Sequence, residues 1–186
     1  MDAGMYERAL KRTGEVVANT IPEQLGDSTP CGDWDVRTLL NHIVAGCITF
    51  AAGGSGEKVS MSDGTDRLGD DHLAAYEKAS ADAAAAFGVP GAIDKNFALP
   101  WGDTPGQVAL GLAVADAAVH GWDLAKATGQ PADIDDDIAE AVYGMTSSMM
   151  KPLGDYPRGE SFGEPVEVPD DAPIADKALA YLGRQP

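Results

Sequence analysis

The chain has 186 residues, which is enough for one domain with a substantial hydrophobic core but short of two. Acidic residues outnumber basic ones 30 to 13, so the formal net charge is -17, and binding to nucleic acid or to an anionic membrane surface is not expected. No apolar run approaches the ~18–20 residues of a membrane span. With two cysteines and no apolar leader at the N-terminus, a cytoplasmic protein without disulfides is predicted.

The first predicted element is a helix over residues 2–20, in which apolar side chains recur between charged ones. A linker from Pro22 to Pro30 separates it from the segment TPCGDWDVRTLLNHIVAGCITFAAGG. There Asp35 is suited to cap a second helix, with Trp34 and Leu39 spaced as a hydrophobic staple.

This second helix is expected to end at Gly53-Gly54. Its apolar residues recur at helical spacing and predict a buried stripe: Val36, Leu39, Leu40, Ile43, Val44, Cys47 and Phe50. His42 lies at the edge of the stripe, and Gly46, one turn later, leaves open space beside the imidazole.

Residues 53–69 are polar and rich in Gly and Ser, which predicts a mobile loop that could cover a site. A third helix is predicted over residues 70–87, with His72 exposed in its first turn. The connector that follows, VPGAIDKNFALPWGDTPG, is rich in turn residues and has room for one short extended piece.

A central helix is predicted from Thr104 to Gly129. Thr104 is suited to be its N-cap, with Gln107 completing a capping box, and Gly129 its left-handed end. The interior is almost entirely Ala, Val, Leu and Gly, so most sides of this helix should be buried. Asp116 and His120 break that pattern, and their spacing of four residues places them on one face.

A further helix is predicted over residues 134–150, with Ile138, Val142, Met145 and Met149 facing inward. After an irregular stretch, a short last helix spans residues 174–182 and ends at Gly183. The prediction is an all-α bundle of about four main helices with additional short ones and long connections, forming a single domain over residues 1–186.

The candidate site consists of His42, Asp116 and His120, which two neighbouring helices would bring together. Catalytic zinc commonly has three ligands of histidine and carboxylate type, with a fourth position open to water or substrate. Spacing alone leaves a second interpretation, because Asp-x-x-x-His in a helix also occurs by accident or as a local hydrogen bond. Asp123 has two readings as well: it could orient His120 or pair with Lys126 on the surface.

The two cysteines are weaker candidates for a functional site than these three residues. Cys47 lies on the apolar stripe and is expected to be a buried, unreactive thiol. Cys31 lies in a loop and could be reactive, but no second cysteine is near in the sequence for redox pairing. The arginines of the C-terminal tail, Arg158 and Arg184, either bind a substrate carboxylate or are ordinary surface residues.

Three segments, CGDWDVRTLLNHI, DAAVHGWDLAKATGQ and FGEPVEVPDDAPIADKALAYLGRQP, resemble the actinobacterial metal-binding branch of the DinB/YfiT superfamily. That branch is similar to the N-terminal domain of mycothiol-dependent maleylpyruvate isomerase. The resemblance implies a DinB-like four-helix bundle that binds a divalent metal, here through His42, Asp116 and His120. Zinc is the expected ion, and nickel, manganese and iron are alternatives.

The resemblance also implies that the metal activates a low-molecular-weight thiol similar to mycothiol, for S-transfer or isomerisation of a small-molecule substrate. The chain has Asp116 where the isomerase has Glu and lacks its C-terminal domain, which argues against isomerase activity itself. Metal-dependent hydrolysis and non-catalytic metal or ligand binding are the alternatives. A homodimer is a possible assembly.

Overall fold

The computed structural model of the chain describes residues 1–150 and 163–186, and it divides into two compact units, residues 1–132 and 133–186. Arg158 lies outside the described residues. The prediction of one domain over the whole chain stays a prediction. All candidate metal ligands lie in the first unit.

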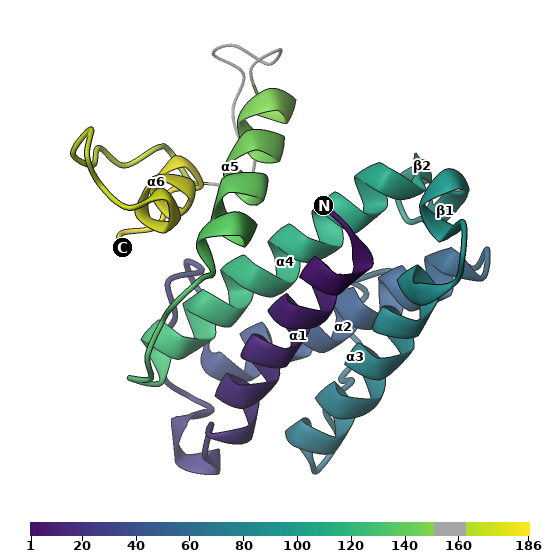
Figure 1. Cartoon of the computed structure of the whole chain (residues 1–186). Helices are drawn as coiled ribbons and strands as arrows, with labels where there is room; N and C mark the ends of the chain where they lie inside the picture. The colour runs from purple at the N-terminus through teal and green to yellow at the C-terminus, as the bar shows by residue number, and fades with distance from the viewer. Residues whose placement is uncertain (151–162) are drawn as a thin grey trace. The chain divides into compact units, whose positions relative to one another are not determined.

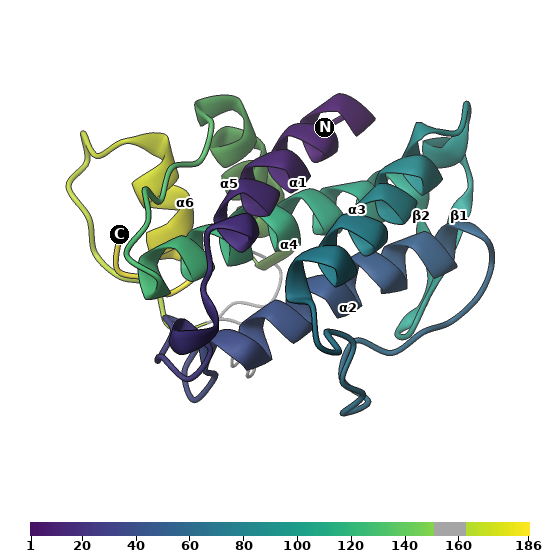
Figure 2. The ribbon, with the colours of Figure 1, turned by 90° about the horizontal axis from the view of Figure 1, so that it is seen from below.

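Four long helices build the first unit: α1 (Ala3–Ala18), α2 (Val36–Gly54), α3 (His72–Gly88) and α4 (Gly106–Ala127). They run alongside one another (Figure 1 and Figure 2). Each packs against two others, in the cyclic order α1–α3–α2–α4. The predicted all-α bundle is thereby confirmed, and the packing of α2 on α4 is the contact that builds the candidate site.

Aspartate side chains cap the first three helices. Asp2 accepts a hydrogen bond from the Met5 amide at 2.9 Å, Asp35 from Thr38 at 2.8 Å and Asp71 from Ala74 at 3.0 Å. Each carboxylate satisfies an amide that has no partner within its helix, next to the positive end of the helix dipole. The cap predicted at Asp35 is confirmed.

The start predicted for α4 is wrong. Thr104 belongs to a short antiparallel hairpin of β1 (Asn96–Leu99) and β2 (Gly102–Pro105), where it pairs with Phe97. Its hydroxyl donates to Gly102 O, and Gln107 donates to Met1 O instead of closing a capping box. Strand pairing keeps Thr104 extended, so the helix begins at Gly106, one residue later than a cap at Thr104 would place it. The hairpin confirms the predicted extended piece.

The C-terminal end of α4 follows the prediction, since Gly129 has a φ of 68°. That left-handed conformation is easy for glycine and disfavoured for other residues. Two short 3-10 helices complete the unit, η1 (Pro22–Gln24) and η2 (Ala92–Asp94).

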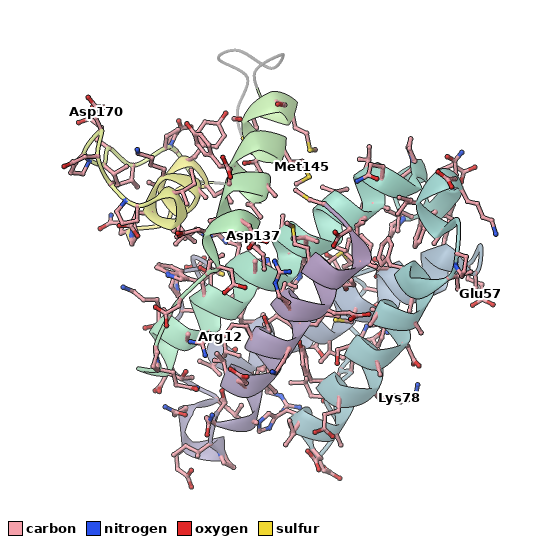
Figure 3. All side chains as sticks on the ribbon, in the orientation of Figure 1. Arg12, Glu57, Lys78, Asp137, Met145 and Asp170 are labelled. Carbon is pink, nitrogen blue, oxygen red and sulfur yellow. The ribbon has the colours of Figure 1, made fainter. Side chains whose placement is uncertain are left out.

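The core of the first unit lies between the helices. All seven residues of the stripe predicted on α2 are buried. At one end Phe87 of α3 stacks on Phe97 of β1 with ring centroids 4.5 Å apart and meets the edge of Tyr6 at 5.4 Å. Charged side chains such as Glu57 and Lys78 lie on the outside (Figure 3).

Among the described residues, α2 and α4 are each long and apolar enough to cross a membrane by length and composition, which the inspection of apolar runs did not predict. In the structure 61% of the α2 window and 72% of the α4 window are buried within the protein. Such burial is what a central position in a helical bundle gives to an apolar helix.

The second unit contains α5 (Asp136–Met150) and α6 (Ile174–Tyr181), which pack against each other. Tyr143 and Tyr181 meet edge to face with ring centroids 5.6 Å apart. Ile138 and Val142 are buried as predicted, but the inward position predicted for Met149 is wrong, because 49% of this residue is exposed. Thr146, one turn before Met149, is buried instead. Its hydroxyl donates a hydrogen bond to Val142 O, so burying this polar group costs little free energy.

Candidate metal centre

The structure brings His42, Asp116 and His120 together. One ligand atom from each lies within 4.8 Å of the others. His42 comes from the second turn of α2, whereas Asp116 and His120 project from one face of α4 at a spacing of one turn. Their side chains are 18%, 20% and 15% exposed, so the group is sheltered but still open to solvent.

The separations between these atoms suit a shared cation better than direct hydrogen bonds. His42 Nε2 lies 3.4 Å and His120 Nε2 lies 3.7 Å from the same atom, Asp116 Oδ1. Hydrogen bonds between nitrogen and oxygen are usually about 2.9–3.0 Å long. Tetrahedral ligands bound about 2.0–2.1 Å from zinc are about 3.3 Å from one another. The donor set therefore fits a divalent ion after shifts of a few tenths of an ångström.

The other nitrogen of His120 makes a true hydrogen bond. Nδ1 lies 3.0 Å from Oδ2 of Asp123, whose side chain is completely buried. A carboxylate can only accept at this contact, so it keeps the imidazole proton on Nδ1 and leaves the Nε2 lone pair directed at Asp116 and His42. Of the two readings of Asp123, orientation of His120 is the one the geometry supports, while Lys126 lies over the Trp122 ring at 5.1 Å.

Local charge holds Asp116 ionised. Burial raises the pKa of its carboxyl, but the neighbouring imidazoles of His42 and His120 outweigh burial, so that the pKa is lowered from 3.8. The pKa of Cys47, a residue of α2, shifts in the opposite direction. Burial and the nearby Asp116 charge raise the pKa of its thiol to about 12, in keeping with the unreactive thiol expected from the sequence.

The loop before α2 supplies two neighbours of the histidines that spacing in the sequence did not identify. The Trp34 ring lies 4.7 Å from the His42 ring and 6.2 Å from the His120 ring. Cys31 donates its thiol hydrogen to Asp123 Oδ2 at 3.0 Å, with its sulfur 3.8 Å from His120 Nδ1.

A closed turn fixes these two side chains. The Thr29 amide and hydroxyl both donate to Trp34 O, the Thr29 hydroxyl also accepts from the Cys31 amide, and Trp34 N donates to Cys31 O. Gly32 provides the left-handed residue in the middle, with a φ of 63°. Pro30 and Gly32, which flank Cys31, are turn-forming residues, but nothing in the sequence tells which helix the turn contacts.

A close approach between α2 and α4 makes room for the carboxylate. A Cβ atom on Gly46 would lie 2.6 Å from Asp116 Oδ2 and 3.2 Å from Met61 Cε. Gly46 therefore does what the sequence predicts, leaving space one turn after His42, although the group that fills the space is Asp116. The Met61 contact brings the segment between α2 and α3 to the same place.

That segment is tied to α2 at several points. The Arg67 amide donates to Asn41 Oδ1, and the Asn41 amide group donates to Thr65 O, at 2.7 and 3.0 Å. Thr49 donates to Val59 O at 3.1 Å, and Leu68 is buried. The polar loop predicted to cover a site does lie beside the ligands, held by side chains of the helix that carries His42.

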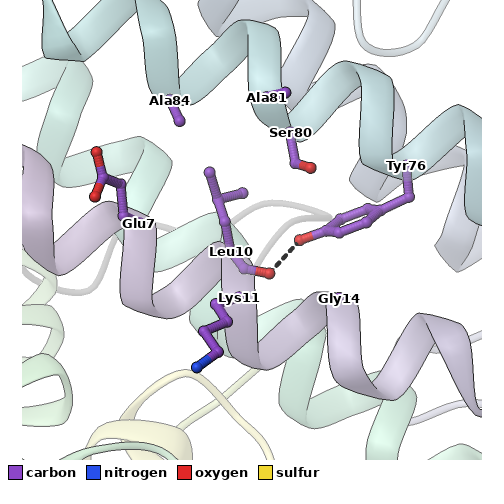
Figure 4. A pocket seen from close by; sticks show the side chains of 8 residues that line it. All are labelled: Glu7, Leu10, Lys11, Gly14, Tyr76, Ser80, Ala81 and Ala84. Atoms are coloured by element: carbon purple, nitrogen blue, oxygen red, sulfur yellow. Dashed lines mark hydrogen bonds between the residues drawn. The ribbon is translucent and has the colours of Figure 1, made fainter.

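His72 and Arg184, the remaining candidates, have local partners. His72 is half-buried, not exposed as predicted, with Nε2 3.2 Å from Thr20 O, and it belongs to neither cluster of possible ligands found among the described residues. Arg184 is buried and donates to Leu182 O in the second unit, so it is not an ordinary surface residue. A cavity of about 300 Å³ lies apart from the candidate ligands, between α1 and α3, and is lined in part by Leu10, Lys11 and Tyr76 (Figure 4).

Comparison with known proteins shows which family contains this arrangement of helices. Residues 6–125, which include every residue of the candidate centre, match the model of the mycothiol maleylpyruvate isomerase N-terminal domain. Two uncharacterized proteins of Mycobacterium tuberculosis, from strains CDC 1551 / Oshkosh and ATCC 25618 / H37Rv, are each 34% identical to the chain over 181 residues, covering 96% of it and 95% of their own length.

A solved structure shares the fold. The crystal structure of the mycothiol-dependent maleylpyruvate isomerase superposes with a TM-score of 0.63 at 15% sequence identity, over 82% of this chain and 70% of that one. The helical DinB-like fold expected from the sequence is thus confirmed. The chain belongs to the mycothiol maleylpyruvate isomerase N-terminal domain family.

Proposed function

We propose that this protein is a divalent-metal-dependent enzyme that activates a low-molecular-weight thiol, similar to mycothiol, for S-transfer or isomerisation. One observation carries the proposal: two imidazole nitrogens lie 3.4 and 3.7 Å from one carboxylate oxygen, at the spacing of ligands around a common ion. Family membership supports the thiol, because the family is named after mycothiol maleylpyruvate isomerase, and the solved structure of similar fold is described as mycothiol-dependent.

The chain's own residues would prepare the site. His42, His120 and Asp116 would hold a divalent cation, with zinc first and nickel, manganese or iron as alternatives. When bound, that cation lowers the pKa of a thiol in the remaining position, so that the thiolate forms near neutral pH. Asp123 keeps His120 in the tautomer with a free Nε2, and Trp34 packs beside both rings and limits their rotation.

Charge favours a thiolate over a neutral ligand. One carboxylate and two neutral imidazoles around a divalent cation leave a local charge of about +1, which attracts an anion to the open position. Met61 lies beside Gly46 and Asp116, and with the segment tied to Asn41 and Thr49 it would shape the pocket for a small molecule.

The test is conjugation of a low-molecular-weight thiol to an electrophile by the purified protein, with metal, without metal and with chelator. Activity should require metal and disappear in His120→Ala. His72→Ala is the matched control, because His72 contacts Thr20 O instead of the candidate ligands and should leave the rate unchanged. The rate should also rise with pH through an apparent pKa below the ~8.5 of a free thiol.

Other results assign the site differently. Hydrolysis of esters or amides that needs metal but no thiol would make the protein a hydrolase, and stoichiometric metal without turnover would make it a binding protein. Protein that neither contains metal nor can be loaded with it would reject the proposal. A cytoplasmic location, the absence of nucleic-acid and membrane partners, and a possible homodimer stay predictions from the sequence.

A further inference from the structure

His120 takes part in two groups of possible ligands, one on each side of its ring. Its Nε2 faces His42 and Asp116, and its Nδ1 faces Cys31 and Asp123. The second group combines a thiol, an imidazole and a carboxylate whose ligand atoms also lie within 4.8 Å of one another. Its members come from the turn before α2 and from α4, so the same packing contact builds both groups.

We propose that Cys31, His120 and Asp123 form a second site, for a thiophilic divalent cation, and that this site excludes an ion bound by His42, Asp116 and His120. The proposal goes beyond thiol activation. It shares one histidine with the proposed function but requires neither a thiol substrate nor catalysis.

Distances support coordination by the second group. Tetrahedral zinc with sulfur at about 2.3 Å and nitrogen or oxygen at about 2.0–2.1 Å separates sulfur from the other ligands by about 3.5 Å. Here the sulfur lies 3.8 Å from His120 Nδ1 and 3.0 Å from Asp123 Oδ2. An outward shift of the thiol by about half an ångström would make room for the ion, and Cys31 lies in a partly exposed turn rather than in a helix.

Charge and proton balance favour a doubly charged ion. On binding, the Cys31 thiol loses its proton to solvent, and the His120 proton is exchanged from Nδ1 to Nε2. The thiolate and the Asp123 carboxylate then offset the two positive charges within a largely sheltered group, where unbalanced charge is costly. A softer ion is preferred, because thiolate ligands select thiophilic metals whereas imidazole and carboxylate also accept manganese.

Exclusion follows from the shared ring. Once Nδ1 binds the cation, the neutral imidazole carries its proton on Nε2, 3.7 Å from Asp116 Oδ1. The first site then keeps only two ligand atoms, from His42 and Asp116. The third ligand atom, His120 Nε2, carries a proton and cannot bind a cation. A thiophilic cation should therefore displace a harder one from the first site without touching His42.

Cadmium tests the proposal, because cadmium bound to a thiolate gives a ligand-to-metal charge-transfer band in the ultraviolet. Added to metal-free protein, Cd²⁺ should produce this band in the wild type and in His42→Ala. The band should be lost in Cys31→Ser. In Asp123→Asn the apparent affinity for Cd²⁺, measured from the growth of the band during titration, should fall at least tenfold. Cys47→Ala is the matched cysteine control and should keep the band, because Cys47 is buried and its pKa is raised to about 12.

Displacement is measured with manganese. Mn²⁺ bound to the wild type, followed by its electron paramagnetic resonance signal, should be released by one equivalent of Cd²⁺, and Cys31→Ser should retain it. No charge-transfer band in the wild type, or a band that persists in Cys31→Ser, would overturn the second site. A band without release of Mn²⁺ would overturn the exclusion. Circular dichroism of each variant checks that loss of the band is not loss of the fold.

Discussion

The substitution Gly46→Ala should separate metal binding from folding. Gly46 lies inside α2, where a Cβ atom would stand 2.6 Å from Asp116 Oδ2 and 3.2 Å from Met61 Cε. Both of these atoms end flexible side chains, so rotation can relieve the contact without moving backbone. The carboxylate that has to move is, however, the one that lies between His42 and His120.

The two effects have opposite signs and can be estimated. An ordinary contact begins at 3.4 Å, so the carboxylate oxygen has to retreat by about 0.8 Å, whereas metal ligands tolerate errors of about 0.2 Å. We therefore expect metal affinity to fall at least tenfold, equivalent to about 1.4 kcal/mol. Without metal, alanine inside a helix should instead gain up to about 1 kcal/mol over glycine.

Thermal unfolding of metal-free and manganese-loaded protein, together with calorimetric titration of manganese, measures both quantities. Gly144→Ala in α5 is the control, because nothing lies within 4 Å of its added Cβ and only the helix-propensity gain should appear. Unchanged manganese affinity in Gly46→Ala would show that Asp116 is not a ligand in the position seen here. A large loss of stability without metal would show that the contact cannot relax by side-chain rotation.

Three further outcomes are expected. Chelator should lower the melting temperature of manganese-loaded wild type, by removing about 4 kcal/mol if the metal was present at a thousandfold excess over its Kd. Equal shifts in His42→Ala would contradict this. Asp123→Asn should weaken metal binding by about 10- to 100-fold, and unchanged affinity in a titration would rule out its role in orienting His120. Asp35→Ala should cost about 1 kcal/mol of unfolding free energy at neutral pH. Hydrogen bonds from Thr38 lower the pKa of Asp35, so the stabilisation by the ionised cap is fully present at pH values above 3.8 and is lost as the pH falls through the lowered pKa. Denaturant titrations of the wild type and Asp35→Ala should show this loss, and a difference in unfolding free energy that is independent of pH would contradict the cap.

Local features of the sequence predicted the helices and much of the candidate centre. Asp116 and His120 are polar exceptions in an apolar helix, and a spacing of four residues places them on one face whatever packs against it. His42 was recognised because it interrupts the edge of a clean apolar stripe. These conclusions need only the helical period, which is why they hold in the structure.

Features that depend on contacts between distant segments were not predicted. The Thr104 cap failed because pairing with Phe97, seven residues earlier in the chain, holds Thr104 in a strand. The sequence offers Cys31 no second cysteine nearby for redox pairing, and it gives no sign of the partner found in the structure, a carboxylate 92 residues away. Met149 follows the helical period but is exposed, because the period marks a face and not how far along the helix the packing extends.

The candidate centre depends on very few parts of the chain. Asp116, His120 and Asp123 follow one another at intervals of four and three residues, so a single helix supplies two candidate ligands and the acceptor that orients one of them. The third ligand has to come from another helix, and Gly46 allows α2 to come close enough to Asp116. The geometry of the centre thus depends on the distance between α2 and α4, and a bound cation should in turn hold these two helices together. A fold shared at 15% identity is compatible with such an arrangement, because most other positions need only keep the helices apolar on their inner faces.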